Sequence, residues 1–122
     1  MKLKIIDKEF AICQVEKISD INFDDEFLFI GKTDNELSLV CQSESIPKAA
    51  LKVDDGWVGF RIEGTLDFSL IGIISKISKI LADSKIGIFT VSTYDTDYIL
   101  VKKQSIQKAN TTLRDNGYII DW

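Results

Sequence analysis

The chain has 122 residues, 45% of them hydrophobic and only one of them proline, so it can bury a core but is too short for several independent domains. Nineteen acidic against fifteen basic residues give a net charge of −4, which argues against nucleic acid as a partner because phosphates would be repelled. We expect no membrane association, because every apolar run is far shorter than the roughly 18 residues of a span. With an acid where a signal peptide needs apolar residues, we expect a cytoplasmic protein.

The side chains that catalysis and metal binding most often use are scarce. The chain has no histidine, which removes the commonest general base and the commonest metal ligand. Cys13 and Cys41 lie in strand-like runs and are expected to be buried and reduced, with a disulfide or a metal pair as the alternative. Two acids, Asp95 and Asp97, are weak support for acid–base chemistry. We therefore expect no enzyme activity, no metal and no cofactor.

The first half of the chain is rich in strand signals. Residues 10–16 alternate with one apolar face, and residues 27–30 are apolar on both faces. A third run, 36–42, is separated from the second by the turn formers of 33–35, so these two runs are expected to pair as a hairpin. Pro47 is expected to open a short helical segment through Leu51.

The second half predicts a different order of elements. A strand at 57–63 is followed by apolar residues at helical spacing, which predict a helix from Phe68 to Ala82 with Thr65 or Asp67 as its cap. The remaining expected elements are strands at 86–91, 97–102 and 118–120 and a helix at 105–116, which Gly117 ends. This order is a split βαβ arrangement of the α+β class, with helices on one face of an antiparallel sheet.

An internal repeat links the two halves. Residues 28–49 laid over residues 88–109, at a constant offset of 60, agree at Phe29, Thr33, Ser45, Ile46, Lys48 and Ala49. Self-similarity at a fixed period usually reports repeated structural units. We therefore expect a truncated N-terminal unit at 1–52, without a long helix, and a complete C-terminal unit at 53–122.

Two segments carry a family resemblance: WVGFRIEGTLDFSLIG at 57–72 and STYDTDYILV at 92–101. They resemble the stand-alone ACT-domain proteins of bacteria, which are similar to the regulatory part of aspartate kinases and to the ACT units of the animal cytosolic arginine sensor. The resemblance is close over 57–103 and looser elsewhere. It implies two ACT-like units with the ferredoxin-like order βαββαβ in tandem, sheets that associate side by side in a homodimer, and an amino acid held between ACT units.

The resemblance also implies a ligand site. An amino acid needs N–H donors for its carboxylate and acceptors for its ammonium group. In the family, the turn from Gly64 to Phe68 lines the pocket, and it leads into a helix start where unpaired N–H groups favour an anion. The second segment supplies further contacts, with Asp97 opposite the cation. The predicted ligand-binding residues are Gly64, Thr65, Leu66, Asp67, Phe68, Thr93, Tyr94 and Asp97.

Several residues in and around these two segments have a purely structural alternative. Asp67 can act as a helix cap, and Asp95 as a turn former. Gly72, inside the predicted helix, is expected to allow close packing between helix and strand, with ligand access as the alternative. Trp57 and Arg61 share a strand face that either serves sheet association or is simply exposed. The arginine sensor carries an acid near the start of its long helix that is missing here, so arginine is not favoured over other amino acids.

The sequence thus predicts a ligand sensor rather than a catalyst. In this interpretation an amino acid bridges two ACT units and shifts the association of a homodimer, or the activity of an unidentified partner protein, which is allosteric regulation. The C-terminal unit is expected to supply most polar contacts. The alternative is an ACT-fold assembly protein that binds no ligand. The ligand itself is not identified by the sequence.

Overall fold

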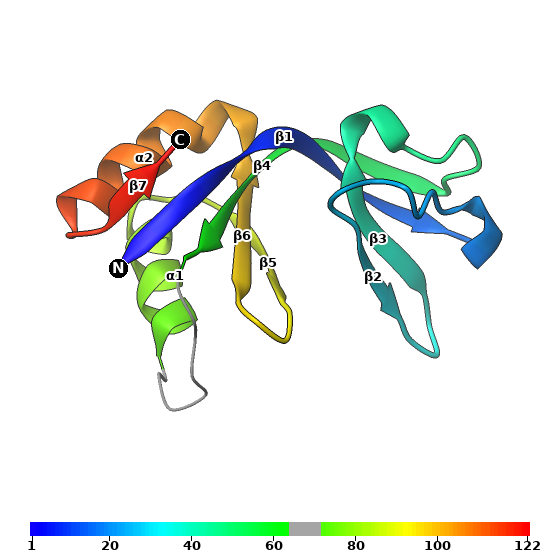
Figure 1. Ribbon diagram of the computed structural model, residues 1–122, viewed down its shortest axis with the longest axis horizontal. Coiled ribbons are helices and arrows are strands. Elements are labelled where there is room, and N and C mark those ends of the chain that lie inside the picture. Colours follow the sequence, from blue (N-terminus) through cyan, green and yellow to red (C-terminus); the bar gives the residue numbers. More distant parts are fainter. Residues whose placement is uncertain (64–71) are drawn as a thin grey trace. The chain divides into compact units, whose positions relative to one another are not determined.

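The computed structural model describes residues 1–63 and 72–122 (Figure 1). Within these ranges strands and helices form the expected α+β fold: β1 (Lys2–Val15), β2 (Phe29–Lys32), β3 (Leu37–Gln42), β4 (Lys52–Ile62), α1 (Ile73–Asp83), β5 (Ile88–Ser92), β6 (Asp97–Lys102), α2 (Ile106–Asp115) and β7 (Ile119–Asp121). Short 3₁₀ turns occur at Ile18–Asp20, Ser43–Ser45 and Lys103–Ser105.

The chain divides into two compact units. One is continuous and consists of Lys8–Trp57, whereas the other combines Met1–Asp7 with Val58–Trp122. The strands β1 and β4 contribute residues to both units. The first seven residues therefore lie in the unit of the C-terminal half, whereas the sequence-based boundary places them with the N-terminal half.

The N-terminal unit is built on the predicted hairpin. β2 and β3 pair antiparallel from Phe29 opposite Val40 to Lys32 opposite Leu37, which confirms that prediction. The other edge of β3 pairs antiparallel with the second half of β1. The alternating face of β1 is buried as expected, in a cluster of Ala11, Cys13, Val15, Ile21, Leu37, Leu39 and Cys41.

The short helix predicted at 47–51 is wrong. A 3₁₀ turn at Ser43–Ser45 follows β3 instead. The backbone N–H of Ala50 then donates to the carbonyl oxygen of Pro47 at 3.1 Å, which closes a tight turn. The next N–H group, that of Leu51, donates to the carbonyl oxygen of Gln14 at 2.7 Å. The chain is thus already extended beside β1 where a helix would need its second turn.

The C-terminal unit has the predicted order of strand, helix, strand, strand, helix and strand, in β4, α1, β5, β6, α2 and β7. Its sheet, however, contains one strand more, because the first half of β1 pairs with β4 on one side and with β7 on the other. β7 runs parallel to β1, with Lys2 opposite Ile119 and Lys4 opposite Asp121. The last strand of the unit, β7, therefore has the N-terminal segment of the chain as its pairing partner.

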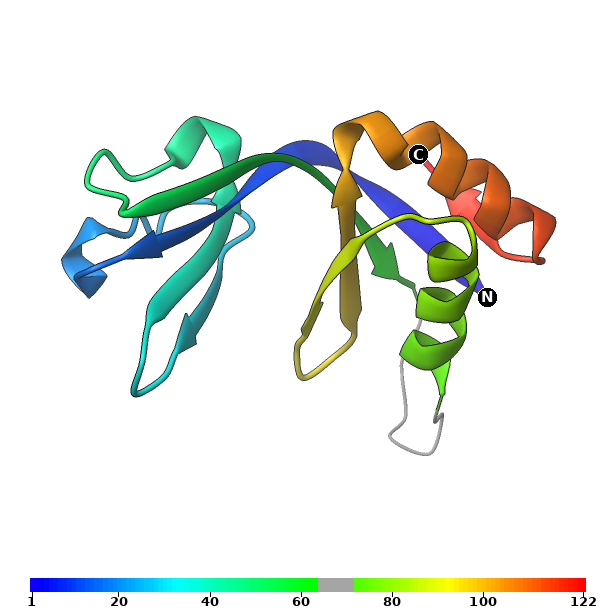
Figure 2. The same cartoon turned by 180° about the vertical axis from the view of Figure 1, so that it is seen from behind.

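The two helices share one core with this sheet. Figures 1 and 2 show α1 and α2 next to each other beside the strands of the unit. Their inward residues are fully buried, as the helical spacing predicts. The cluster comprises Leu3, Ile5, Phe60, Ile62, Ile77, Leu81, Ile86, Ile99, Val101, Ala109, Leu113 and Ile120.

Two glycines mark helix ends. Gly117 has a φ of 92° directly after the cap residue of α2, which confirms it as the C-terminal stop. Gly72 has a φ of 84° and stands at the N-cap of α1, and a Cβ placed there would meet no atom within 4 Å. The expectation that Gly72 lies inside the helix and allows close packing between helix and strand is therefore wrong; the residue supplies a left-handed backbone conformation before the first turn.

The internal repeat of the sequence is also a repeat of structure. β3 and β6 are offset by 60 residues at both ends, as are the 3₁₀ turns that follow them. The hairpin turns agree as well: the Thr33 N–H donates to the Glu36 carbonyl at 2.9 Å, and the Thr93 N–H donates to the Thr96 carbonyl at 2.8 Å. The counterpart of α1 is missing, since the described chain between β1 and β2 contains only the 3₁₀ turn.

Candidate functional site

The β5–β6 hairpin holds the three predicted site residues that the structure describes, with Thr93 and Tyr94 in the turn and Asp97 at the start of β6. The strands pair up to Ser92 opposite Asp97. The Thr93 hydroxyl donates to the Thr96 carbonyl at 3.0 Å, alongside the bond from the Thr93 N–H to the same oxygen. The Thr93 hydroxyl oxygen also accepts from the Thr96 N–H at 3.4 Å. The hydroxyl proton and one lone pair are thus used inside the turn, which leaves a single lone pair to accept from a ligand.

Tyr94 and Asp97 lie in different surroundings. The Tyr94 side chain is 89% exposed at the tip of the turn. Asp97 is partly buried at the first position of β6. The turn therefore presents one aromatic ring to solvent and one carboxyl group at the strand end. The other five predicted residues, Gly64, Thr65, Leu66, Asp67 and Phe68, lie outside the described residues.

Thr96 is a residue that the sequence reasoning missed. It is only 8% exposed, and its hydroxyl donates to the carbonyl oxygen of Ile62 at 2.7 Å. Ile62 is the last residue of β4 and stands two positions before Gly64. This hydrogen bond fixes the β5–β6 turn to the end of β4, where the predicted Gly64–Phe68 segment begins.

The Thr96 hydroxyl gives a stability prediction. Replacing it in Thr96→Val leaves the Ile62 carbonyl without this donor, so we expect a loss of about 1–3 kcal/mol of unfolding free energy. The matched control is Thr90→Val in β5, since Thr90 is exposed and its replacement should stay within about 0.5 kcal/mol. Urea unfolding of both variants measures the difference. Equal effects of the two substitutions would contradict the role of the buried bond.

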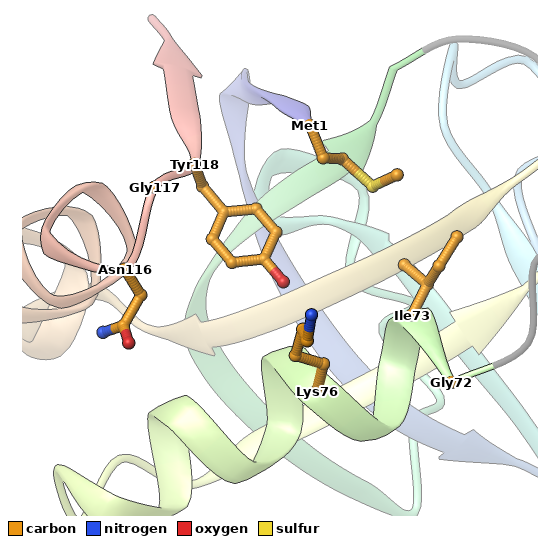
Figure 3. Close-up of a pocket in the computed structure, with 7 residues that line it drawn as sticks. All are labelled: Met1, Gly72, Ile73, Lys76, Asn116, Gly117 and Tyr118. Atoms are coloured by element: carbon orange, nitrogen blue, oxygen red, sulfur yellow. The ribbon is translucent and has the colours of Figure 1, made fainter.

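A cavity of about 320 Å³ lies elsewhere in the C-terminal unit (Figure 3). Its walls are the start of α1, the first residue of the chain and the segment between α2 and β7. The lining residues are Met1, Gly72, Ile73, Lys76, Asn116, Gly117 and Tyr118. Figure 3 shows the Tyr118 hydroxyl and the Lys76 amino group directed toward one another, with Met1 near Ile73. None of Thr93, Tyr94 and Asp97 lines this cavity.

A second cavity belongs to the N-terminal unit. It measures about 630 Å³ and is lined by the end of β1, by the β2–β3 turn and by Ile18 and Leu51. The turn in its wall, from Thr33 to Glu36, is the repeat counterpart of the turn from Thr93 to Thr96. The N-terminal unit thus offers a concave surface at the matching place.

Trp57 and Arg61 are not the exposed strand face that the sequence suggested. Trp57 is 8% exposed, and Arg61 is partly buried with its Nε 3.7 Å from a Glu63 carboxylate oxygen. Their side chains are therefore largely covered within the described chain. This burial leaves little indole surface for sheet association.

The two cysteines are free and buried, which confirms the reduced interpretation. Burial raises the pKa of the Cys41 thiol to about 12 and also raises the pKa of Cys13. In the ranges 1–63 and 72–122, no group of three acidic, cysteine or histidine side chains could hold a metal ion. Nor do these residues form a helix of the length and hydropathy needed to cross a membrane.

Comparison with solved structures gives several similar folds. The sequence is 34% identical to that of an Agobacterium tumefaciens protein with a known crystal structure. The two folds superimpose with a TM-score of 0.89, which covers 98% of this chain and 90% of that one. The regulatory subunit of aspartate kinase from Thermus thermophilus is 8% identical, with a TM-score of 0.62 over 93% and 95%. The aspartate kinase of Clostridium acetobutylicum is 14% identical, with a TM-score of 0.66 over 91% of this chain and 33% of that one.

Comparison with family sequence models divides the chain in two. A search of curated proteins gave no match. The model of an N-terminal domain family matches residues 8–49. The model of the ACT domain matches residues 52–115 and so covers more than half of the chain. Together with the α+β architecture and the aspartate kinase neighbours, this match shows that the chain belongs to the ACT-domain family.

Proposed function

We propose that this protein is a regulatory module without catalytic activity that binds a small molecule, an amino acid, between ACT units. The ligand is held at the end of the C-terminal unit where β4 ends and the β5–β6 turn lies. Asp97 contacts the ligand's ammonium group, and the Gly64–Phe68 segment receives its carboxylate. Binding changes the stability of a homodimer or the activity of a separate partner protein.

One observation carries this proposal. The hydrogen bond from the Thr96 hydroxyl to the Ile62 carbonyl holds the turn with Thr93, Tyr94 and Asp97 against the end of β4. The two predicted ligand-binding segments, Gly64–Phe68 and Thr93–Asp97, are far apart in the sequence. This bond supports the proposal that both contribute to one site at one end of the unit. A site assembled from a strand end and a neighbouring turn is typical of small-molecule sites, which need few polar groups converging from different elements.

The edge of the same unit favours coupling to a dimer. Among the described strands β5 pairs only with β6, so its other edge carries backbone groups that a second sheet can pair. Thr90 and Ser92 on this strand are exposed. Because β5 leads directly into the β5–β6 turn, a ligand that orders the turn would also favour one arrangement of the edge.

Thermal melting against the twenty amino acids tests the proposal. A ligand present at 100 times its dissociation constant should stabilise the native protein by roughly 2.7 kcal/mol. Asp97→Asn should lose most of this stabilisation, because it removes the charge facing the ammonium group. No stabilisation by any amino acid would count against a sensor and favour the assembly protein that binds no ligand.

The matched control is Asp95→Asn. It makes the same change of charge two residues away, in the exposed part of the same turn. We expect this variant to melt with ligand as the unmodified protein does. If both variants lost the response equally, general charge rather than a specific contact would explain the binding, and Asp97 would not be the ligand contact.

A further inference from the structure

The cavity of about 320 Å³ in the C-terminal unit has a polar and an apolar side. Lys76, Tyr118 and Asn116 carry the polar side chains of its lining, whereas Met1 and Ile73 carry apolar ones (Figure 3). Its volume is near the lower end of the range of about 300–1,000 Å³ that is usual for small-molecule sites. It therefore suits a compact molecule with one polar end and one apolar end.

The fold fixes the backbone that carries both polar groups. The left-handed conformation of Gly117 ends α2, and the Tyr118 N–H donates to the Leu113 carbonyl at 3.1 Å. The Tyr118 ring then packs against the buried core of the unit. On the opposite wall, the Lys76 N–H donates to the Gly72 carbonyl at 2.9 Å in the first turn of α1. The backbone of the two walls is thus fixed before binding, whereas the exposed Lys76 side chain keeps its rotamer freedom.

The charge of the cavity favours an anion. Lys76 is the single ionisable side chain besides Tyr118 among the lining residues, and none of them is acidic. Burial raises the pKa of the Tyr118 hydroxyl, so this group stays protonated and can donate at neutral pH. The start of α1 adds N–H groups without intrahelical partners. A carboxylate can therefore receive one charge-assisted and one neutral hydrogen bond here.

We propose that this cavity is a second ligand site, which binds a small apolar monocarboxylate through Lys76 and Tyr118. The carboxylate accepts hydrogen bonds from the Lys76 ammonium and the Tyr118 hydroxyl, and the apolar part of the ligand packs against Met1 and Ile73. An amino acid fits less well, because no acidic side chain among the lining residues compensates for burying its ammonium group. The site shares no residue with the proposed amino-acid site.

Titration by two-dimensional amide NMR tests the site with three probes of one skeleton. 4-Methyl-2-oxopentanoate carries a carboxylate and no amine, leucine adds the ammonium group, and 4-methylpentanamide carries no charge. We expect the oxo acid to bind most tightly and to shift the amide signals of Ile73, Lys76, Gly117 and Tyr118. Tighter or equal binding of leucine or the amide would overturn the assignment to a monocarboxylate.

Variants separate the specific contact from general attraction. Lys76→Met keeps the aliphatic stem and should weaken binding of the oxo acid roughly tenfold, as should Tyr118→Phe. The control is Lys79→Met on the next turn, since Lys79 pairs with Asp83 at 2.9 Å and does not line the cavity. It should change the affinity by less than about twofold. Equal weakening by Lys76→Met and Lys79→Met, or no signal shifts at all, would overturn the proposal.

The outcome is independent of the amino-acid site. Asp97→Asn should leave binding of the oxo acid unchanged, and Lys76→Met should leave stabilisation by an amino acid unchanged. The two variants therefore distinguish failure of the monocarboxylate site from failure of the amino-acid site.

Discussion

Leu3→Ala is expected to destabilise the C-terminal unit by about 2–5 kcal/mol, although Leu3 is separated from the rest of that unit by some fifty residues of sequence. Leu3 is fully buried in the cluster that also contains residues of α1 and α2. The backbone around it bridges two strands: the Glu63 N–H donates to the Lys2 carbonyl at 2.9 Å, and the Ile119 N–H donates to the Met1 carbonyl at 3.0 Å. Urea unfolding measures the loss.

The control for Leu3→Ala is the same substitution at Leu51. Leu51 is 60% exposed, so Leu51→Ala should change stability by no more than about 0.5 kcal/mol. A chain that begins at Lys8 extends the test, because it lacks the part of β1 between β4 and β7. We expect it to lose the amide protection of α1 and α2. Retention of protected helices in that chain would show that β1 is not part of their fold.

The Cys41 thiol is expected to resist alkylation in the native protein. With its pKa raised by burial from 9.0 to about 12, its thiolate fraction near pH 8 is about 1,000-fold lower than that of an ordinary thiol, and the thiolate is the reactive form. Iodoacetamide labelling followed by mass spectrometry should find Cys41 unmodified in buffer and modified in urea.

An exposed thiol provides the reference for this experiment. Ser75→Cys places one on the outer face of α1, where Ser75 is exposed, and it should label quickly in the native state. The burial also has a pH signature. Between pH 9 and 12 the unfolded chain has lost the Cys41 proton and the folded chain has kept it, so stability should fall as the pH rises, by about 1 kcal/mol per unit. Labelling of Cys41 as fast as the thiol introduced on α1 would contradict this picture.

Elements with strong local signals could be predicted from the sequence. β6 begins and ends where the sequence places it, because six residues of strand propensity lie between a turn and a 3₁₀ segment. α2 differs from its expected bounds by one residue at each end, since Gly117 supplies an unambiguous stop. Here local preference and tertiary environment agree.

Features that depend on distant partners could not be predicted. β1 begins at Lys2, and residues 2–5 alternate between charged and apolar side chains, but the alternation breaks between Ile6 and Glu9, so the sequence does not indicate one continuous strand up to Val15. The pairing with β4 on one side and β7 on the other, together with the burial of Leu3, extends the strand over this segment. The role of Thr96 likewise needs the Ile62 carbonyl, which comes from an element 34 residues away in the sequence. No local pattern reports either partner.

The discontinuous C-terminal unit has a consequence for where the chain could be shortened. The backbone bonds from Glu63 to Lys2 and from Leu51 to Gln14 belong to one antiparallel register. This register places Asp7 opposite Val58, the two residues that directly flank the continuous unit. The N-terminal copy of the repeat is thus an insertion nested inside a β-hairpin rather than a domain appended to its end. A short turn joining Asp7 to Val58 would restore the uninterrupted hairpin and excise the inserted copy whole.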